Sequence, residues 1–251
     1  MELTKCPVCK CPVNVVRRSD GAADHYEHID QFERHNIPNP ISPVLADYLR
    51  AKRVGKKTVA IMGSDWSSGP WAPFGEIEVW GMNMLHGRPW FNTGDASRWL
   101  QIHPKWVFTS ESVHNHWEWL QEEHPFPIYM QMVYDDIPSS VKYPLKEIQN
   151  DLINIERGEL PVKNLFTSSF NFQIALALYE GYERLEIYGV SLLGGGEYAY
   201  QREAMAYWLG KADGMGVEVW LPDTCALLVE PLYGYDVIRH GETGEIVSKP
   251  I

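Results

Sequence analysis

Two cysteines and two histidines near the start of the chain have the types and the spacing of a zinc site. Cys6 and Cys9 form the run CPVC, and His25 and His28 form the run HYEH further along. Two intervening residues let both thiolates turn toward one ion, and Zn²⁺ prefers tetrahedral sets of cysteine and histidine ligands. We therefore predict a zinc site made by Cys6, Cys9, His25 and His28.

The segment around these residues is predicted to be a small separate module. The run CPVNVVRRSDGAADHYEHI favours a hairpin that turns near Asp20 and Gly21, followed by a helical turn that carries the histidines. The spacing of the two histidines is one residue shorter than usual, so Cys11 or His35 remains an alternative to one of them. An ion held entirely by protein has no open position for substrate, which indicates a structural role. Residues 1–35 are assigned to this zinc-knuckle module, and the proline-rich residues 36–56 to a linker with a short helix.

A second chemical signature lies close to the other end of the chain. The run RHGET, from Arg239 to Thr243, spells the phosphohistidine motif of the histidine phosphatases. That motif must follow an early central strand, and its pocket needs a second histidine and further arginines downstream. Only eight residues follow Thr243, so the pocket cannot be built. Two short β-rich runs around a glycine turn instead predict a C-terminal hairpin over residues 236–251.

Hydroxyl, amide and glycine residues follow the predicted strands of the middle of the chain. In parallel α/β sheets, ligands bind beyond the carboxyl ends of the strands, and the first turn of a helix suits an anionic group. The loop GSDWSSG is neither a Walker loop nor a G-x-G-x-x-G fingerprint. These rules select the following candidates for nucleotide binding: Gly63, Ser64, Ser67, Ser68, Gly69, Asn83, Thr167, Ser168, Ser169 and Arg202.

The elements that must position these candidates alternate between strands and helices. Strands are predicted at KTVAIMG, EIEVWGMN, WLQIHP, KWVFTS, FPIYMQM, RLEIYGV and VEVWLP. Helices are predicted at VHNHWEWLQEEH, at about Ser169 to Glu180 and at EAMAYWLGKADGMG, and YDDIPSSVKYPLKEIQNDLIN is predicted to be a loop leading into a helix. The alternation predicts an α/β fold over residues 57–235, with a Rossmann-like, doubly wound and mostly parallel sheet.

The runs KTVAIMGSDWSSG, VWGMN and TSSFNFQIALALYEGYERLEIYGVSL together resemble a known superfamily. They are similar to the Rossmann-like superfamily of bacterial sialyltransferases and hydroxymethylpterin pyrophosphokinase-like proteins. The later run EYAYQREAMAYWLGKADGMGVEVWLP resembles uncharacterised bacteriophage proteins. The resemblance implies a nucleotide-binding loop after the first strand and an Asn at the end of the second. The sequence departs from the superfamily at Ser191, where an aspartate is expected.

Three functions fit these features. The first is a glycosyltransferase-like enzyme that binds a nucleotide or nucleotide sugar, with His103 or Glu197 as the catalytic base. The second is a phosphoryl or pyrophosphoryl transferase that uses ATP and Mg²⁺ held by Asp65, Asp135 and Asp136. The third is a non-enzymatic nucleotide-binding or assembly protein.

The bulk composition narrows the classes of partner. The net charge of −11 and the pI near 5.3 disfavour binding to nucleic-acid backbone. No apolar run approaches the roughly 18 residues that cross a membrane, and the first residues lack the apolar core of a signal peptide. We therefore expect a cytoplasmic protein with a small-molecule nucleotide ligand, and a homo-oligomer is compatible with the sequence.

Overall fold

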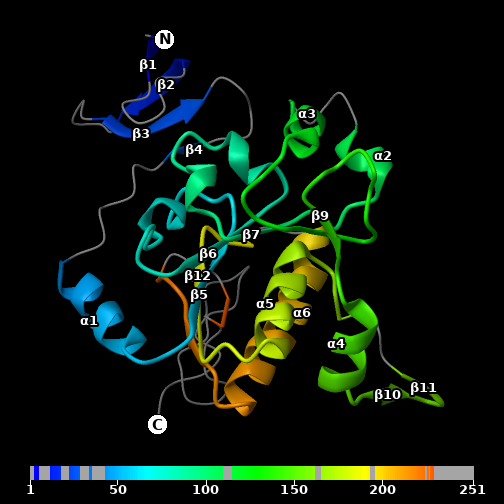
Figure 1. Ribbon diagram of the computed structural model, residues 1–251. Helices are drawn as coiled ribbons and strands as arrows, with labels where there is room; N and C mark the ends of the chain where they lie inside the picture. Colours follow the sequence, from blue (N-terminus) through cyan, green and yellow to red (C-terminus); the bar gives the residue numbers. More distant parts are fainter. Residues whose placement is uncertain are drawn as a thin grey trace, which may run out of the picture.

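Short apolar runs form the seven strands of a parallel sheet in the computed structural model of this protein (Figure 1). The structure describes residues 3–5, 12–17, 23–28, 34–35, 43–109, 115–161, 165–192, 196–223, 225 and 227–228. The strands of the large sheet are β5 (Thr58–Met62), β6 (Glu78–Met82), β7 (Arg98–Leu100), β8 (Ile128–Met130), β9 (Ser140–Lys142), β12 (Arg184–Tyr188) and β13 (Glu218–Trp220). Their order across the sheet is β13-β12-β5-β6-β7-β8-β9, and every described pair is parallel. The predicted Rossmann-like α/β fold is therefore confirmed.

Helices lie on both faces of this sheet. The α-helices are α1 (Pro43–Arg53), α2 (Lys105–Phe108), α3 (His116–Gln121), α4 (Leu145–Leu152), α5 (Ser169–Tyr179) and α6 (Glu197–Gly214). Short 3₁₀ turns are η1 (Gly69–Trp71), η2 (Asn83–Gly87) and η3 (Thr93–Asp95). The small strands β10 (Glu156–Arg157) and β11 (Leu160–Pro161) pair outside the sheet. None of the helices in the described part of the chain is long and apolar enough to cross a membrane.

The helix α5 is the centre of the larger core. It is apolar almost all round, because it packs between the sheet and α6, and most of its residues are buried. The two helices lie side by side in Figure 1, on the opposite side of the sheet from α1. Helix α5 ends in a Schellman motif, in which Gly181 has φ 73° and the N–H of Tyr182 donates to the carbonyl of Ala177 at 3.0 Å.

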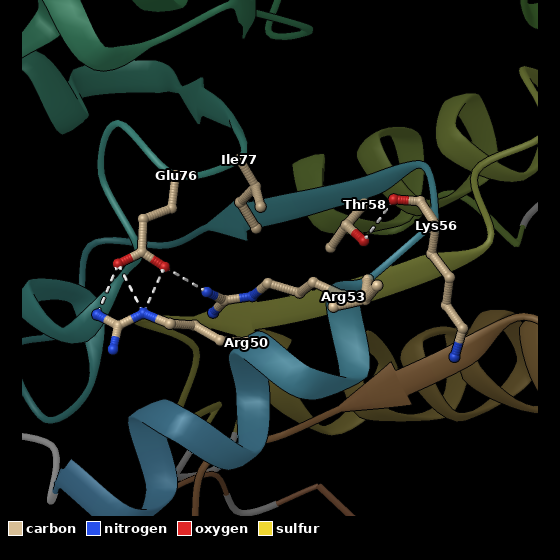
Figure 2. Close-up of a pocket in the computed structure, with 7 residues that line it drawn as sticks. Arg50, Arg53, Lys56, Thr58, Glu76 and Ile77 are labelled. Carbon is tan, nitrogen blue, oxygen red and sulfur yellow. Dashed lines mark hydrogen bonds and ion pairs between the residues drawn. The ribbon is translucent and has the colours of Figure 1, made fainter.

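Ion pairs attach α1 to the opposite face of the sheet, at the amino ends of the strands. Glu186 on β12 is fully buried and accepts hydrogen bonds from Arg53, Arg184 and Tyr188. Arg53 also reaches Glu76, which pairs with Arg50 nearer the surface (Figure 2). A series of ion pairs, from Arg50 and Glu76 near the surface to Glu186 in the core, thus holds α1 on the sheet.

The N-terminal region contains four strands of its own. They are β1 (Leu3–Lys5), β2 (Pro12–Arg17), β3 (Ala23–His28) and β4 (Arg34–His35), joined as an antiparallel sheet in that order. The β2–β3 pair confirms the predicted hairpin. His25 and His28 lie within strand β3, so the predicted helical turn is wrong.

Three further predictions of local structure need correction. The run KWVFTS, predicted to be a strand, contains α2, which begins directly after Pro104. Proline at the N-cap position ends an extended segment and permits a helix to start, and this outweighs the apolar pattern of the run. The predicted loop after β8 contains the additional strand β9. Helix α6 begins at Glu197, ahead of the predicted start.

Candidate functional site

The candidate site lies at the carboxyl edge of the sheet, beside β5, the strand from which the sheet extends to both sides. After β5 the chain adds β6 to β9 on one side, and it later returns to place β12 and β13 on the other side. The carboxyl ends of β5 and β12 therefore mark the topological switch point, the place where open α/β sheets bind ligands in a crevice. The loops after these two strands begin at Gly63 and Gly189.

These two glycines bring the backbones of the two loops into direct contact. The N–H of Gly63 donates to the carbonyl of Tyr188 at 2.7 Å, and the N–H of Asp65 donates to the carbonyl of Gly189 at 2.9 Å. A Cβ atom on Gly63 would lie 2.1 Å from the carbonyl oxygen of Gly189, so only glycine fits. Ser68 is fully buried, and its hydroxyl accepts a hydrogen bond from the N–H of Gly189 at 2.9 Å. Gly63 and Ser68 therefore hold the loops after β5 and β12 together at the switch point.

The other loop candidates have different surroundings. Ser64 is exposed at the crevice, directly after Gly63. The N–H of Ser67 donates to the carboxylate of Asp65 at 2.8 Å, which fixes the turn. Gly69 begins η1 and lies under the ring of Trp90, where a Cβ atom would clash at 2.4 Å. Among these loop residues, Ser64 is therefore best placed to meet a ligand.

Asn83 at the end of β6 joins the crevice to the start of α5. Its amide nitrogen donates to the hydroxyl of Ser169 at 3.2 Å, although the two residues are far apart in sequence. Asn83 has φ 47°, a left-handed conformation that is uncommon outside glycine. Backbone strain of this kind persists where the surrounding structure holds it, and it clusters at ligand sites. The structure thus brings two of the predicted site residues, Asn83 and Ser169, together.

The N-terminus of α5 is capped as the sequence predicted. Ser168 is the N-cap residue, and the side-chain oxygen of Asn171 accepts hydrogen bonds from the N–H groups of Thr167 and Ser168, both at 3.0 Å. Asn171 is fully buried, and its amide nitrogen has no partner among the described residues. A buried donor without a partner is unusual and costs free energy, which makes it a candidate for contact with a ligand or water.

Hydrogen bonds join helix α6 to the residue before the cap of α5 and to the chain after β12. The hydroxyl of Thr167 donates to the carbonyl of Tyr200 at 3.3 Å, and the guanidinium of Arg202 donates to the carbonyl of Leu192 at 2.8 Å. Leu192 has φ 48°, so a second strained residue lies at this edge. Arg202 lies inside α6 and holds Leu192, four residues after the end of β12.

The two candidate bases follow different strands of the sheet. His103 is exposed in the loop after β7, whereas Glu197 is the first residue of α6, on the side of β12. The strands β5 and β6 separate the two positions in the sheet order.

A pair of histidines near this edge, the half-buried His86 and the buried His116, was not predicted from the sequence. His86 lies on η2, three residues after Asn83, and its Nε2 is 2.8 Å from Nδ1 of His116 on α3. The ring of His86 also stacks on Trp119 at a centroid distance of 4.4 Å. Burial lowers the pKa of His86 to about 4, with help from nearby His124, and burial with His86 and His103 nearby lowers the pKa of His116 to about 3.

These depressed pKa values predict that the protein loses stability in mild acid. An unfolded histidine titrates near pH 6.5, so each folded pKa lies below its unfolded value. The unfolded state therefore binds more protons as the pH falls below about 6.5, and by pH 5 each histidine should reduce the free energy of unfolding by about 2 kcal/mol. Urea unfolding at pH 7.5 and pH 5.0 measures this. The double variant His86→Phe/His116→Phe should have a much smaller fall, and an equal fall in both proteins would contradict the assignment.

The metal sites predicted from the sequence have different outcomes. Cys6 and Cys9 lie outside the described residues, so the zinc site stays a prediction. Among the side chains that the structure describes, no group of three or more His, Cys, Asp or Glu residues is placed to hold a metal ion. Asp65 accepts from its own loop, and Asp136 pairs with Lys105, so the expected carboxylate set for Mg²⁺ is not assembled there. Cys225 is a buried free cysteine, and the predicted C-terminal hairpin with the RHGET run lies outside the described residues.

Two pockets in the described part of the chain lie away from this edge. One, of about 400 Å³, is at the amino ends of the strands and is lined by Arg50, Arg53, Lys56 and Glu76 (Figure 2). Its cations are matched by carboxylates: Arg50 and Arg53 pair with Glu76, and Lys56 pairs with Glu218. This charge balance favours a structural role over anion binding. The other pocket, of about 660 Å³, follows the edge strand β13.

Comparison with known proteins gives only distant likenesses. No protein-family model matches the chain, and no curated protein matches it. A structure of the sialyltransferase CstII from Campylobacter jejuni with cytidine-5'-monophosphate is 13% identical, covers 68% of this chain and 84% of its own, and has a TM-score of 0.43. A second structure of CstII, with CMP-3FNeuAc, is 11% identical, covers 66% and 80%, and has a TM-score of 0.41. The strand order of this chain, rather than these likenesses, defines its fold.

Proposed function

We propose that this chain is a glycosyltransferase-like enzyme that binds a nucleotide sugar at the carboxyl edge of its parallel sheet. The observation that carries the proposal is the contact between Asn83 and Ser169, which joins the end of β6 to the start of α5 beside the switch point. Both residues are partly accessible, and both lie where α/β folds bind nucleotides.

The phosphate of the donor is assigned to the N-terminus of α5. The first N–H groups of a helix lack partners within the helix, and the positive end of its dipole favours an anion. Asn171 adds a buried amide donor without a partner among the described residues. Ser64 and Asn83 supply neutral hydrogen-bonding groups suited to the nucleoside and the sugar.

The reaction would need one proton acceptor. The acceptor hydroxyl attacks the anomeric carbon, a new C–O bond forms, and the bond from that carbon to the phosphate oxygen breaks. The nucleoside phosphate leaves with the bonding electrons, and the hydroxyl proton passes to a base. His103 and Glu197 are the two candidates for this base. The helix dipole stabilises the charge on the departing phosphate.

The variants Asn83→Gly and Ser169→Ala test the site. Glycine keeps the positive φ of Asn83 while the amide is removed, so the backbone is preserved. Each variant should weaken the binding of a nucleotide sugar about tenfold, the equivalent of one hydrogen bond of about 1.4 kcal/mol. Calorimetric titration with a panel of nucleotide sugars and with ATP and Mg²⁺ measures the affinity and separates the two transferase classes.

Matched controls come from elsewhere on the chain. Ser97→Ala removes a hydroxyl that bonds to Glu78 near the amino edge, and Asn150→Ala removes an exposed amide on α4. Both control variants should bind as tightly as the unmodified protein. The proposal fails if both site variants bind with unchanged affinity, or if the protein responds only to ATP with Mg²⁺.

A further inference from the structure

A groove follows the outer edge of the strand β13. It has a volume of about 660 Å³, and every residue from 216 to 221 lines it. Tyr48 on α1 and Leu209 on α6 also line the groove, and both helices flank the sheet from opposite faces. The groove therefore has the shape of a missing strand position, with a strand edge as its floor and a helix on each side.

The edge of β13 has unused backbone groups. Among the described strands, β13 is paired with β12 alone. The N–H of Glu218 donates to the carbonyl of Glu183 at 3.0 Å, toward β12. Since backbone groups of successive residues in a strand point to opposite sides, the N–H of Val219 faces the groove. Open edges of this kind are normally covered, because they otherwise pair with other chains.

We propose that residues 236–240, the run DVIRH, occupy this groove and extend the sheet beside β13. The chain reaches the groove itself, because Leu228 lines it and is 67% exposed there. The residues 229–235 that lead onward can span about 23 Å when extended, and three strand residues cover about 10 Å. The connection is therefore long enough to return along β13.

The side-chain pattern of the run fits a position covered on both faces. Val237 and Ile238 are adjacent, so in a strand they point to opposite faces. A hairpin exposed on one face would alternate apolar and polar residues instead. Each side of the groove offers an apolar contact, Tyr48 from α1 and Leu209 from α6, beside the charged groups of Lys52 and Asp213. A tethered segment also competes well with a second copy, since its effective concentration is high at any protein concentration.

Amide hydrogen exchange of the full chain tests the proposal. We expect the N–H of Val219 to exchange at least about 100-fold more slowly than in an unstructured peptide, because it is hydrogen-bonded in the groove. Ile238→Asp should remove most of this protection, since it places a charge against an apolar contact of the groove. Thr243→Asp, in the predicted turn, is the matched control and should leave Val219 protected. The N–H of Ala60 in the central strand reports whether each variant is folded.

Three results would overturn the proposal. Free exchange of Val219 in the unmodified chain would mean that the groove is empty. Equal protection of Val219 in Ile238→Asp and Thr243→Asp, with Ala60 protected in both, would mean that residues 236–240 do not cover the edge. Protection that rises with protein concentration, together with a dimer in sedimentation, would assign the groove to a second copy of the chain.

Discussion

Gly189→Ala is expected to destabilise the protein by about 3 kcal/mol or more and to abolish nucleotide binding at the carboxyl edge. Gly189 has φ 66°, which an alanine adopts only with strain. A steric clash adds more to the cost than this strain does. The new Cβ atom would lie 2.4 Å from the carbonyl oxygen of Gly63 and 2.8 Å from its carbonyl carbon. Both are backbone atoms of the neighbouring loop, so neither can rotate away, and the two loops must separate.

The separation of these loops would damage the switch point directly. The hydrogen bonds of Asp65 and Ser68 to Gly189 would stretch or break, and the N–H of Gly189 would lose a buried partner. Urea unfolding measures the stability, and titration with the nucleotide sugar that the unmodified protein binds measures the site. We expect loss of binding even at temperatures where the variant remains folded.

Gly181→Ala is the matched control for this effect. Gly181 has φ 73°, close to that of Gly189, but a Cβ atom there would meet nothing within 4 Å. This variant should therefore show the backbone strain alone, about 1 kcal/mol, and bind the nucleotide normally. If Gly189→Ala is no less stable than Gly181→Ala, the close approach of the two loops is not what holds the switch point together.

The regular elements could be predicted because their signals are local. Apolar runs that end in glycine gave β5, β6 and β12, and the Thr-Ser-Ser run before an apolar stretch gave the start of α5. Local sequence signals could not predict the strand order, because β12 pairs with β5 only after a long crossover connection. The helix α2 was mistaken for a strand, because Val107 and Phe108 fit a strand pattern and four residues carry little helical periodicity.

The candidate site could be predicted as a set of positions but not as a set of contacts. The rule on carboxyl ends of strands selected Asn83 and Ser169, and the structure joins them. The same rule could not distinguish exposed Ser64 from buried Ser68, since both follow one strand in one loop. The pair of His86 and His116 depends on the packing of α3 onto η2, and only the position of His86 soon after Asn83 hinted at it.

Glu186→Gln is expected to have the largest effect on stability, a loss of about 3–5 kcal/mol. Glu186 has no exposed surface, and its carboxylate accepts from Arg53 at 2.7 and 3.0 Å and from Arg184 at 2.8 Å. Burial alone would raise the pKa of Glu186, but the hydrogen bonds of Arg53, Arg184 and Tyr188 outweigh it, and the pKa is lowered. The carboxylate is therefore ionised in the core, and it is what neutralises the guanidiniums around it.

A neutral amide at position 186 would leave Arg53 with Glu76 and Arg184 with Glu218, and both of these remaining carboxylates are more than a third exposed. The side chain of Arg53 is 10% exposed and that of Arg184 is 4% exposed, so neither can be solvated without movement of α1 or β12. Removal of one partner from a buried ion pair is costly because it leaves an uncompensated buried charge. We expect α1 to detach from the sheet before the sheet itself unfolds, and exchange of the α1 amides measures this.

Glu76→Gln is the control variant, because it removes a carboxylate that also pairs with two arginines but is partly exposed instead of buried. Glu76 pairs with Arg53 and also with Arg50, but its side chain is 38% exposed, because it lies at the surface end of this series of ion pairs (Figure 2). Water screens this pair, so its loss should cost about 1 kcal/mol or less. The attachment of α1 therefore depends on where the carboxylate lies rather than on how many arginines it meets. Equal costs for the two variants would show instead that Glu186 is solvated in the folded protein and that α1 is held by Leu49 and its apolar contacts.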